Sequence, residues 1–218
     1  MPTDLSVDLP LIDHHCHGVS PAELDWKSFQ AMFSESYLPP PPGTSEFQKP
    51  LGLMIRRFCA PMLDLEPLAS GEAYVERRLA LGAAEVNRRL LTACGLDSLL
   101  IDTGHRSNAI MTWQEMAKIA GRPAHEVVRI EAVAEEVAKS GVSAAAFPDA
   151  FAAELDKRAA AAVGLKTIVA YRVTFAIDQT ALDKANVVEA AGTWFAKASE
   201  AKRWRLEDAT IIRHGLWV

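Results

Sequence analysis

Short apolar runs recur along the chain, and each is separated from the next by sequence typical of helices. Runs of this length between helical stretches favour parallel strands that are buried on both faces. The alternation of strand and helix indicates βα units with right-handed crossovers. We therefore predict an α/β fold with parallel strands in sequence order, at residues 9–15, 98–103, 127–133 and 165–171.

The segment between the first two predicted strands, residues 19–97, is far longer than one crossover helix requires. Residues 72–92 are rich in Ala, Leu, Glu and Arg, which predicts one helix, with Gly95 where a terminating glycine belongs. We expect residues 19–97 to be a helical insertion over the carboxyl ends of the strands. Such an insertion either builds a substrate pocket or only stabilises the fold.

Later parts of the chain also predict helices. Residues 142–162 are alanine-rich but carry enough charge for an ordinary amphipathic helix. Residues 182–204 predict one or two more helices, and we expect Trp194, Phe195 and Trp204 to be core anchors. Residues 207–218 begin another helix or a fifth strand, and the sequence around His214 favours the helix.

The first strand leads directly into a histidine-rich stretch, Asp13-His14-His15-Cys16-His17-Gly18. Side chains alternate across a strand, so His15 and His17 point the same way, with Asp13 beneath them. Neutral imidazole is a good ligand for zinc and similar ions. We predict that His15 and His17 bind one divalent metal, while Cys16 points away into packing. The alternative is a chance histidine-rich turn.

Two stretches resemble the metal-dependent amidohydrolase superfamily, whose members are (β/α)8 barrels. Residues 12–17 resemble its first-strand Asp-x-His-x-His motif. Residues 164–172 are similar to its fourth strand, especially in the amidohydrolase-related branch that includes domains fused to glutamine-synthetase-like proteins. The resemblance implies a (β/α)8 TIM-barrel type of fold, of which this chain supplies about the first four βα units. It also implies a hydrolase whose metal-activated water attacks a carbon–nitrogen or ester bond, although relatives also decarboxylate or isomerise.

The resemblance also marks Lys166 as a metal ligand. In several amidohydrolases the fourth-strand lysine is carboxylated and bridges two metals, and the sequence Leu-Lys-Thr-Ile around Lys166 is similar. A lysine in an apolar strand is costly unless it is paired or modified. The alternative is that the Lys166 amine reaches solvent or pairs with Glu131 or Asp102.

Several other residues are candidates near the strand ends. Tyr171 and Arg172 close the fourth predicted strand, where Arg172 would clamp a substrate carboxylate or form a structural salt bridge. His105 follows the second strand and is either a contact for substrate or metal, or a solvated loop histidine. Glu131, within the third predicted strand, is a candidate for a hydrogen bond to a metal-binding histidine.

The family pattern continues beyond what this sequence supplies. It also needs a histidine at strand five, often another at strand six, and an aspartate at strand eight, and no residue after Arg172 can be assigned to them. We therefore expect residues 1–218 to be a single N-terminal part of an amidohydrolase barrel, inactive alone and completed by self-association or a second chain. The alternatives are a non-catalytic metal- or partner-binding module and a decarboxylase of the same superfamily.

The amino-acid composition limits the kinds of partner and cellular location that we expect for this chain. A net charge of −5 gives no basic surface for nucleic acid or anionic lipid. No run approaches the ~18 apolar residues of a membrane span. Residues 1–10 carry no positive side-chain charge, which argues against a secretory signal, and three cysteines without regular spacing argue against a disulfide framework. We expect a cytoplasmic protein with a small-molecule substrate and a divalent metal, with zinc as the first choice.

Overall fold

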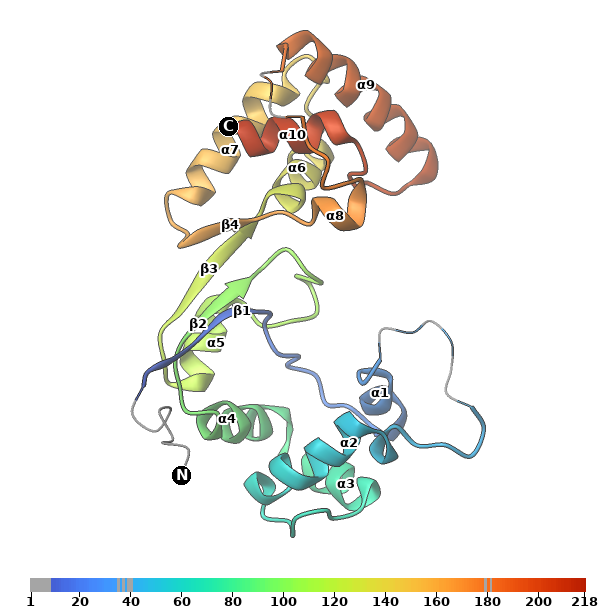
Figure 1. Ribbon diagram of the computed structural model, residues 1–218, viewed down its shortest axis with the longest axis vertical. Coiled ribbons are helices and arrows are strands. Elements are labelled where there is room, and N and C mark those ends of the chain that lie inside the picture. The colour runs from blue at the N-terminus through green and yellow to red at the C-terminus, as the bar shows by residue number, and fades with distance from the viewer. Residues whose placement is uncertain (1–8, 35, 37, 39–40, 179, 181) are drawn as a thin grey trace. The chain divides into compact units, whose positions relative to one another are not determined.

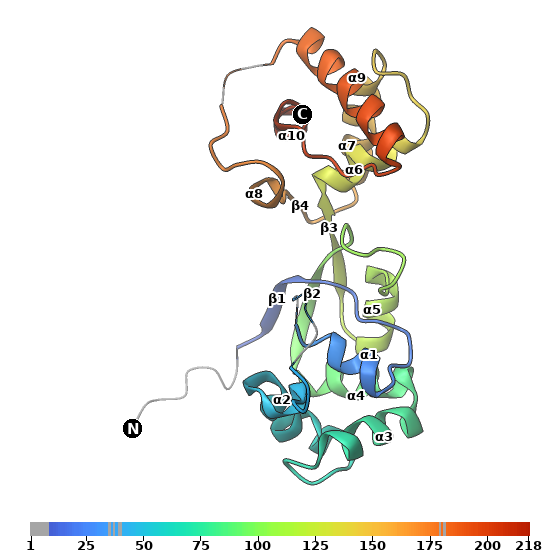
Figure 2. The same ribbon diagram turned by 90° about the vertical axis from the view of Figure 1, so that its right-hand side faces the viewer.

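The computed structural model describes residues 9–34, 36, 38, 41–178, 180 and 182–218, which form two compact units (Figures 1 and 2). The first unit holds the residues up to Asp13, Gly18–Leu99 and Asn108–Ala124. The second holds His14–His17, Leu100–Ser107 and His125–Val218. Residues 1–8 lie outside the described residues, so the expectation about the N-terminus stays a prediction.

The described strands form a four-stranded sheet whose order follows the sequence. The strands are β1 (Leu11–Cys16), β2 (Leu96–Asp102), β3 (Ala124–Arg129) and β4 (Gly164–Lys166). β3 and β4 are parallel, with Arg129 opposite Lys166 at the end of the ladder. The predicted α/β class and strand order are confirmed. That these strands are about the first four βα units of a TIM-barrel type of fold, and that residues 19–97 are an insertion, stay predictions.

The third predicted strand was too long. β3 ends at Arg129, and helix α6 (Ile130–Lys139) follows at once, so Glu131 lies in the first turn of a helix (Figure 1). The buried apolar positions Ile130, Val133, Ala134 and Val137 have the i, i+3, i+4, i+7 spacing of a helix face. A short apolar run does not distinguish a buried strand from a buried helix, which explains the error.

The fourth predicted strand was also too long. β4 ends at Lys166, and Val169–Arg172 form the short helix α8. Beyond Arg129 its neighbour β3 has turned into a helix, so no strand remains opposite the residues after Lys166. Backbone groups without a ladder partner need other hydrogen bonds, and here the chain bends into a helical turn.

Four longer helices build the second unit: α6, α7 (Phe147–Ala159), α9 (Lys184–Ala201) and α10 (Ala209–Trp217). α9 packs against α7 and α10 (Figure 2). Their shared core is aromatic: Phe147 and Trp194 are buried, and Phe195 and Trp204 pack against it. The predicted anchors are thus confirmed, and His214 lies in a helix as expected. The helix expected at 142–162 is shorter, because α7 spans only Phe147–Ala159.

Helices also make up most of the first unit. They are α1 (Trp26–Ala31), α2 (Pro50–Met54), α3 (Gly71–Leu81), α4 (Ala83–Ala93) and α5 (Trp113–Ala120), with short 3-10 or π segments η1 (Glu46–Gln48), η2 (Ile55–Cys59) and η3 (Pro61–Leu63). The single helix predicted at 72–92 is two helices, because Gly82 interrupts it with a φ of 79°. That this region covers a substrate site stays a prediction.

None of the described helices is long and apolar enough to cross a membrane.

Candidate metal centre

Side chains from the four strand ends meet within the second unit. His15 lies near the end of β1, and Asp102, Arg129 and Lys166 are the last residues of β2, β3 and β4. His17 follows β1 directly. One potential ligand atom each from His15, His17 and Asp102 lies within 4.8 Å of the other two. The predicted histidine pair is therefore joined by a carboxylate.

Asp102 is the buried acid of the group. It is fully buried, and its Oδ2 accepts hydrogen bonds from Nη2 of Arg129 at 2.6 Å and from Nζ of Lys166 at 2.9 Å. Its Oδ1 accepts the backbone N–H of Gly104 at 2.9 Å. Burial acts to raise the pKa of Asp102, but the hydrogen bonds from Arg129, Lys166 and Gly104 outweigh it and lower the pKa to about 2. Asp102 is therefore a carboxylate at neutral pH.

The hydrogen bonds of the two histidines define which nitrogens are available. Nδ1 of His17 lies 3.0 Å from the backbone oxygen of Asp102, and because a carbonyl only accepts, Nδ1 carries the proton. Nε2 of His15 lies 2.8 Å from the ammonium of Lys166, which only donates, so this Nε2 carries a lone pair. In their neutral forms both rings thus have a lone pair on Nε2, as imidazole does when it binds a metal, and that of His15 accepts from Lys166.

Two of the potential donor atoms, one from His15 and one from Asp102, already contact a positive charge. The ammonium of Lys166 contacts both Nε2 of His15 and Oδ2 of Asp102. Desolvation is the largest cause that lowers the pKa of His15, and the charge of Lys166 adds to it, which favours the neutral ring.

Two imidazoles and a carboxylate are a donor set of the kind that zinc accepts. Ligand atoms that share one zinc ion at ~2.1 Å are at most about 4.2 Å apart, so the present spacing needs only a small contraction. The residues present therefore fit a divalent metal.

His105 lies beside this group. Its ring centroid is 4.8 Å from that of His17, and the side chain is exposed. Partial desolvation is the largest cause that lowers the pKa of His105, followed by the charge of His17. The structure thus brings His105 to the candidate centre. Its role towards a substrate stays a prediction.

Two of the predicted substrate residues are placed differently. Arg172 lies in α8 and not at a strand end, and its Nη1 bonds Oε1 of Glu135 at 3.0 Å and the backbone oxygen of Leu206 at 2.9 Å. Its contacts match the structural salt bridge that we named as the alternative. Tyr171 also lies in α8, with 83% of its surface exposed. The structure therefore does not bring Arg172 to the histidine pair.

The hydrogen bonds of Glu131 go to Thr167 and Ile168 and not to the histidines. Its Oε1 accepts from Oγ1 of Thr167 at 2.5 Å and from the backbone N–H of Ile168 at 2.9 Å. The expectation that Glu131 orients a histidine was therefore wrong in its partner. Glu131 lies in helix α6 and not in a strand as predicted, so its side chain points to other partners.

Sequence reasoning missed two members of the group. Asp102 was considered only as a partner for Lys166, and Arg129 was not considered at all. Asp102 lies near the end of the predicted second strand, a position that could have singled it out. Arg129 lies inside the predicted third strand, and only the observed end of β3 reveals its position. Gly104 also belongs here, because a Cβ on it would lie 2.4 Å from Cβ of Arg129. The close packing of Gly104 holds the arginine towards Asp102.

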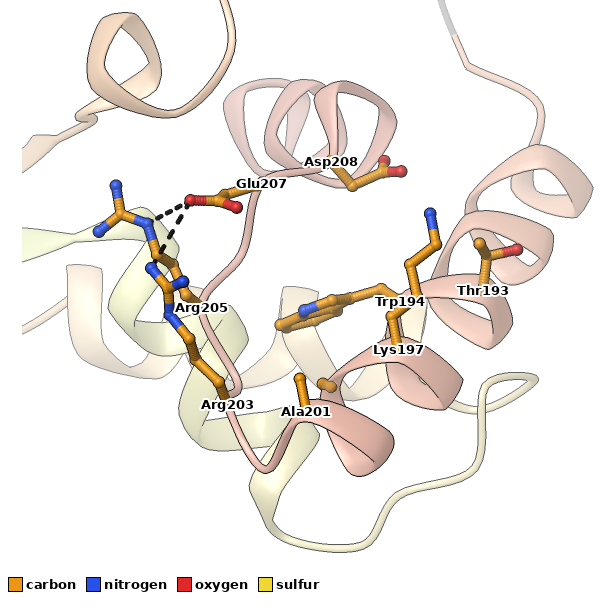
Figure 3. Close-up of a pocket in the computed structure, with 9 residues that line it drawn as sticks. Thr193, Trp194, Lys197, Ala201, Arg203, Arg205, Glu207 and Asp208 are labelled. Atoms are coloured by element: carbon orange, nitrogen blue, oxygen red, sulfur yellow. Dashed lines mark hydrogen bonds and ion pairs between the residues drawn. The ribbon is translucent and has the colours of Figure 1, made fainter.

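A separate pocket of about 340 Å³ lies where the C-terminal part of α9 meets the start of α10 (Figure 3). Glu207 pairs with Arg205 and, at 4.0 Å, with Arg203, while Asp208 caps α10 through the N–H groups of Thr210 and Ile211. Both acidic side chains of this pocket are therefore already bound to neighbouring groups of the chain. Basic residues after a helix C-terminus also complement the helix dipole. We therefore place the candidate chemistry at the strand ends.

Comparison with known proteins yields one similar fold. No protein-family model matches the sequence, and no curated protein is similar enough to count as a relative. Among solved structures, the chain is similar to a proposed metal-dependent hydrolase from Lactobacillus casei ATCC 334, with a TM-score of 0.63 and 22% identity. The match covers 96% of this chain and 54% of that protein. The chain thus spans about half the length of its structural neighbour and shares that part of its fold.

Proposed function

We propose that this chain is the metal-binding part of a metal-dependent hydrolase of the amidohydrolase type. The observation that carries the proposal is the meeting of His15, His17 and Asp102 at the ends of β1 and β2. The structural similarity to a protein described as a proposed metal-dependent hydrolase supports the same reading. Because the chain spans 54% of that protein, the activity of a whole enzyme is part of the proposal.

In this proposal His15 and His17 hold the metal through Nε2, and Asp102 adds a carboxylate oxygen. A divalent metal bound there, with zinc as our first choice, would lower the pKa of a coordinated water towards ~7. Arg129 holds Asp102 ionised and fixed in place through its 2.6 Å hydrogen bond. The backbone oxygen of Asp102 holds the ring of His17 in one tautomer.

Lys166 has two states in this account. As an ammonium it occupies donor atoms that a metal would use, because it contacts His15 and Asp102. Carboxylated at Nζ, it would become an anionic ligand, as the resemblance to the amidohydrolases implies. The metal centre therefore forms when the Lys166 ammonium is either moved aside or converted to the carbamate.

The open side of the centre is suited to a small-molecule substrate. His15 and His105 are exposed, while Asp102 is fully buried, so solvent reaches the donors from the histidine side. In this proposal His105 contacts a substrate that approaches there. The bond attacked in this proposal is a carbon–nitrogen or ester bond, and the chain acts in the cytoplasm.

The experiment is a turnover assay on the purified chain, loaded with zinc, manganese or cobalt, against panels of amides, esters and lactones. Turnover that needs metal and disappears in the His15→Ala, His17→Ala double variant supports the hydrolase. We expect little or no turnover by the chain alone and measurable turnover only with a second copy or a completing chain, because the chain spans only part of its structural neighbour. Tight metal binding without any turnover, also in the presence of a second copy or a completing chain, would instead support the non-catalytic metal-binding module.

A further inference from the structure

The corner between β3 and α6 lies between the two strands that carry Asp102 and Lys166. In the strand order, β3 has β2 on one side and β4 on the other. The last residue of β3, Arg129, reaches the last residue of β2, Asp102, through its guanidinium. Two positions later Glu131 reaches the other way, to the residues that follow β4. The corner between β3 and α6 thus forms hydrogen bonds with the end of β2 on one side and with the residues after β4 on the other.

Glu131 takes over where the β3–β4 ladder stops. The ladder ends with Arg129 opposite Lys166, and the next residue of this strand already belongs to α6. Thr167 and Ile168 therefore have no strand beside them. Their hydroxyl and backbone N–H both donate to Oε1 of Glu131, at 2.5 and 2.9 Å. The carboxylate replaces the missing strand for the two residues directly after Lys166.

The burial of Glu131 is unusual for a purely stabilising residue. The side chain has no exposed surface, and within the described part of the chain its Oε2 has no hydrogen-bond partner. A buried carboxylate with an unpaired oxygen lowers the stability of a fold. The residue is therefore better explained by what its other oxygen holds than by its contribution to stability.

We propose that Glu131 is a positioning residue that keeps Lys166 against His15 and Asp102 by holding Thr167 and Ile168. The backbone that follows Lys166 is fixed by the two hydrogen bonds to Glu131, and the backbone before it is fixed by the ladder to β3. The reach of the Lys166 side chain towards the strand ends follows from these two anchors. The importance of this for metal binding rests on the proposed function, whereas the position of Lys166 does not.

The test measures how fast lysines react with a trace of acetic anhydride in the metal-free protein, by peptide mass spectrometry. The reactivity of Lys166, whose side chain is 21% exposed, is divided by that of Lys157, which is 76% exposed. Glu131→Ala and Thr167→Val remove the acceptor and the hydroxyl donor, and we expect both to raise this ratio several-fold. Glu131→Gln and Thr167→Ser keep an acceptor and a hydroxyl, and we expect them to retain the wild-type ratio.

Glu135→Ala is the matched control, because Glu135 lies one turn further along α6 and binds Arg172 and the N–H of Leu206. This variant should leave the ratio unchanged. Unchanged Lys166 reactivity in folded Thr167→Val and Glu131→Ala would overturn the proposal, as would an equal rise in Glu135→Ala. If Glu131→Ala does not fold, Thr167→Val decides.

Zinc titration of the same variants separates the two proposals. With bicarbonate present, we expect Glu131→Ala and Thr167→Val to bind zinc about tenfold to hundredfold more weakly, because the carboxylated Lys166 is then a ligand that has lost its supporting hydrogen bonds. Without bicarbonate the Lys166 ammonium competes with the metal, and we expect these variants to bind zinc no more weakly than the wild type. If wild-type protein binds no zinc while the reactivity pattern holds, the proposed function fails and the positioning role stands. If zinc binds equally to all variants and the pattern is absent, the positioning role fails and the metal site stands.

Discussion

The ammonium of Lys166 lies 2.8 Å from Nε2 of His15, a residue 151 positions earlier in the chain. This contact makes Lys166 a direct competitor for one of the proposed metal ligands, since an ammonium and a metal use the same lone pair. The same ammonium occupies Oδ2 of Asp102. Metal binding should therefore depend on the chemical state of Lys166.

We predict that bicarbonate strengthens zinc binding by the wild-type chain. Carbon dioxide in equilibrium with bicarbonate carboxylates the neutral amine, which turns a competing cation into an anionic ligand. Isothermal titration with zinc, in carbonate-free buffer and then with added bicarbonate, should show the higher affinity in the second case.

A Lys166→Met variant provides the comparison, because it has no amine to carboxylate and no ammonium to compete. Its zinc affinity should not respond to bicarbonate. An equal response of both proteins would show that bicarbonate acts elsewhere, and no response of the wild type would remove Lys166 from the ligand set.

Asp102→Asn should destabilise the metal-free protein strongly. The substitution leaves the buried guanidinium of Arg129 and the ammonium of Lys166 without their shared counter-charge. Breaking a buried ion pair on one side costs about 3 to 5 kcal/mol in the free energy of unfolding. Urea unfolding at neutral pH measures the loss.

The exposed ion pair between Asp149 and Lys184 is the control for this effect. Asp149→Asn should cost at most about 1 kcal/mol, because water screens exposed pairs. Similar losses in the two variants would contradict the picture of Asp102 as a buried centre of the network.

The stability of the metal-free protein should also fall with acid in a window set by Asp102. Its pKa is lowered from 3.8 to about 2 in the folded chain, so the unfolded chain takes up the proton first. The stabilisation is fully present above the unfolded pKa and is lost as the pH falls towards 2. The stability difference between wild type and Asp102→Asn should therefore be constant from pH 5 to 7 and should shrink below pH 4. A difference that does not change down to pH 2 would contradict this.

The sequence predicted the site best where the signal was local. The alternation of side chains in a strand was enough to pair His15 with His17, and the apolar runs located all four strands. The ends of the strands were harder to predict from the sequence. Ile130 and Val133 extend an apolar run that fits a strand and a helix equally well, and only packing in the second unit decides for α6.

The network around Asp102 depends on which residues end neighbouring strands. Arg129 and Lys166 are partners in the β3–β4 register, and this places both near Asp102. Register depends on pairing between segments far apart in sequence, so no local pattern reveals it. For the same reason Arg172, which reads as the end of a strand, could not be assigned to its partner Glu135 in advance.

The most direct test of the account is zinc binding by the wild-type chain and by the His15→Ala, His17→Ala double variant. The matched control is His125→Ala, which removes an exposed histidine from β3 outside the centre. We predict that the wild type and His125→Ala bind zinc equally and that the double variant loses binding by at least about a hundredfold, since a catalytic zinc site generally has only three protein ligands. Equal zinc binding by the wild type and the double variant would contradict the metal centre.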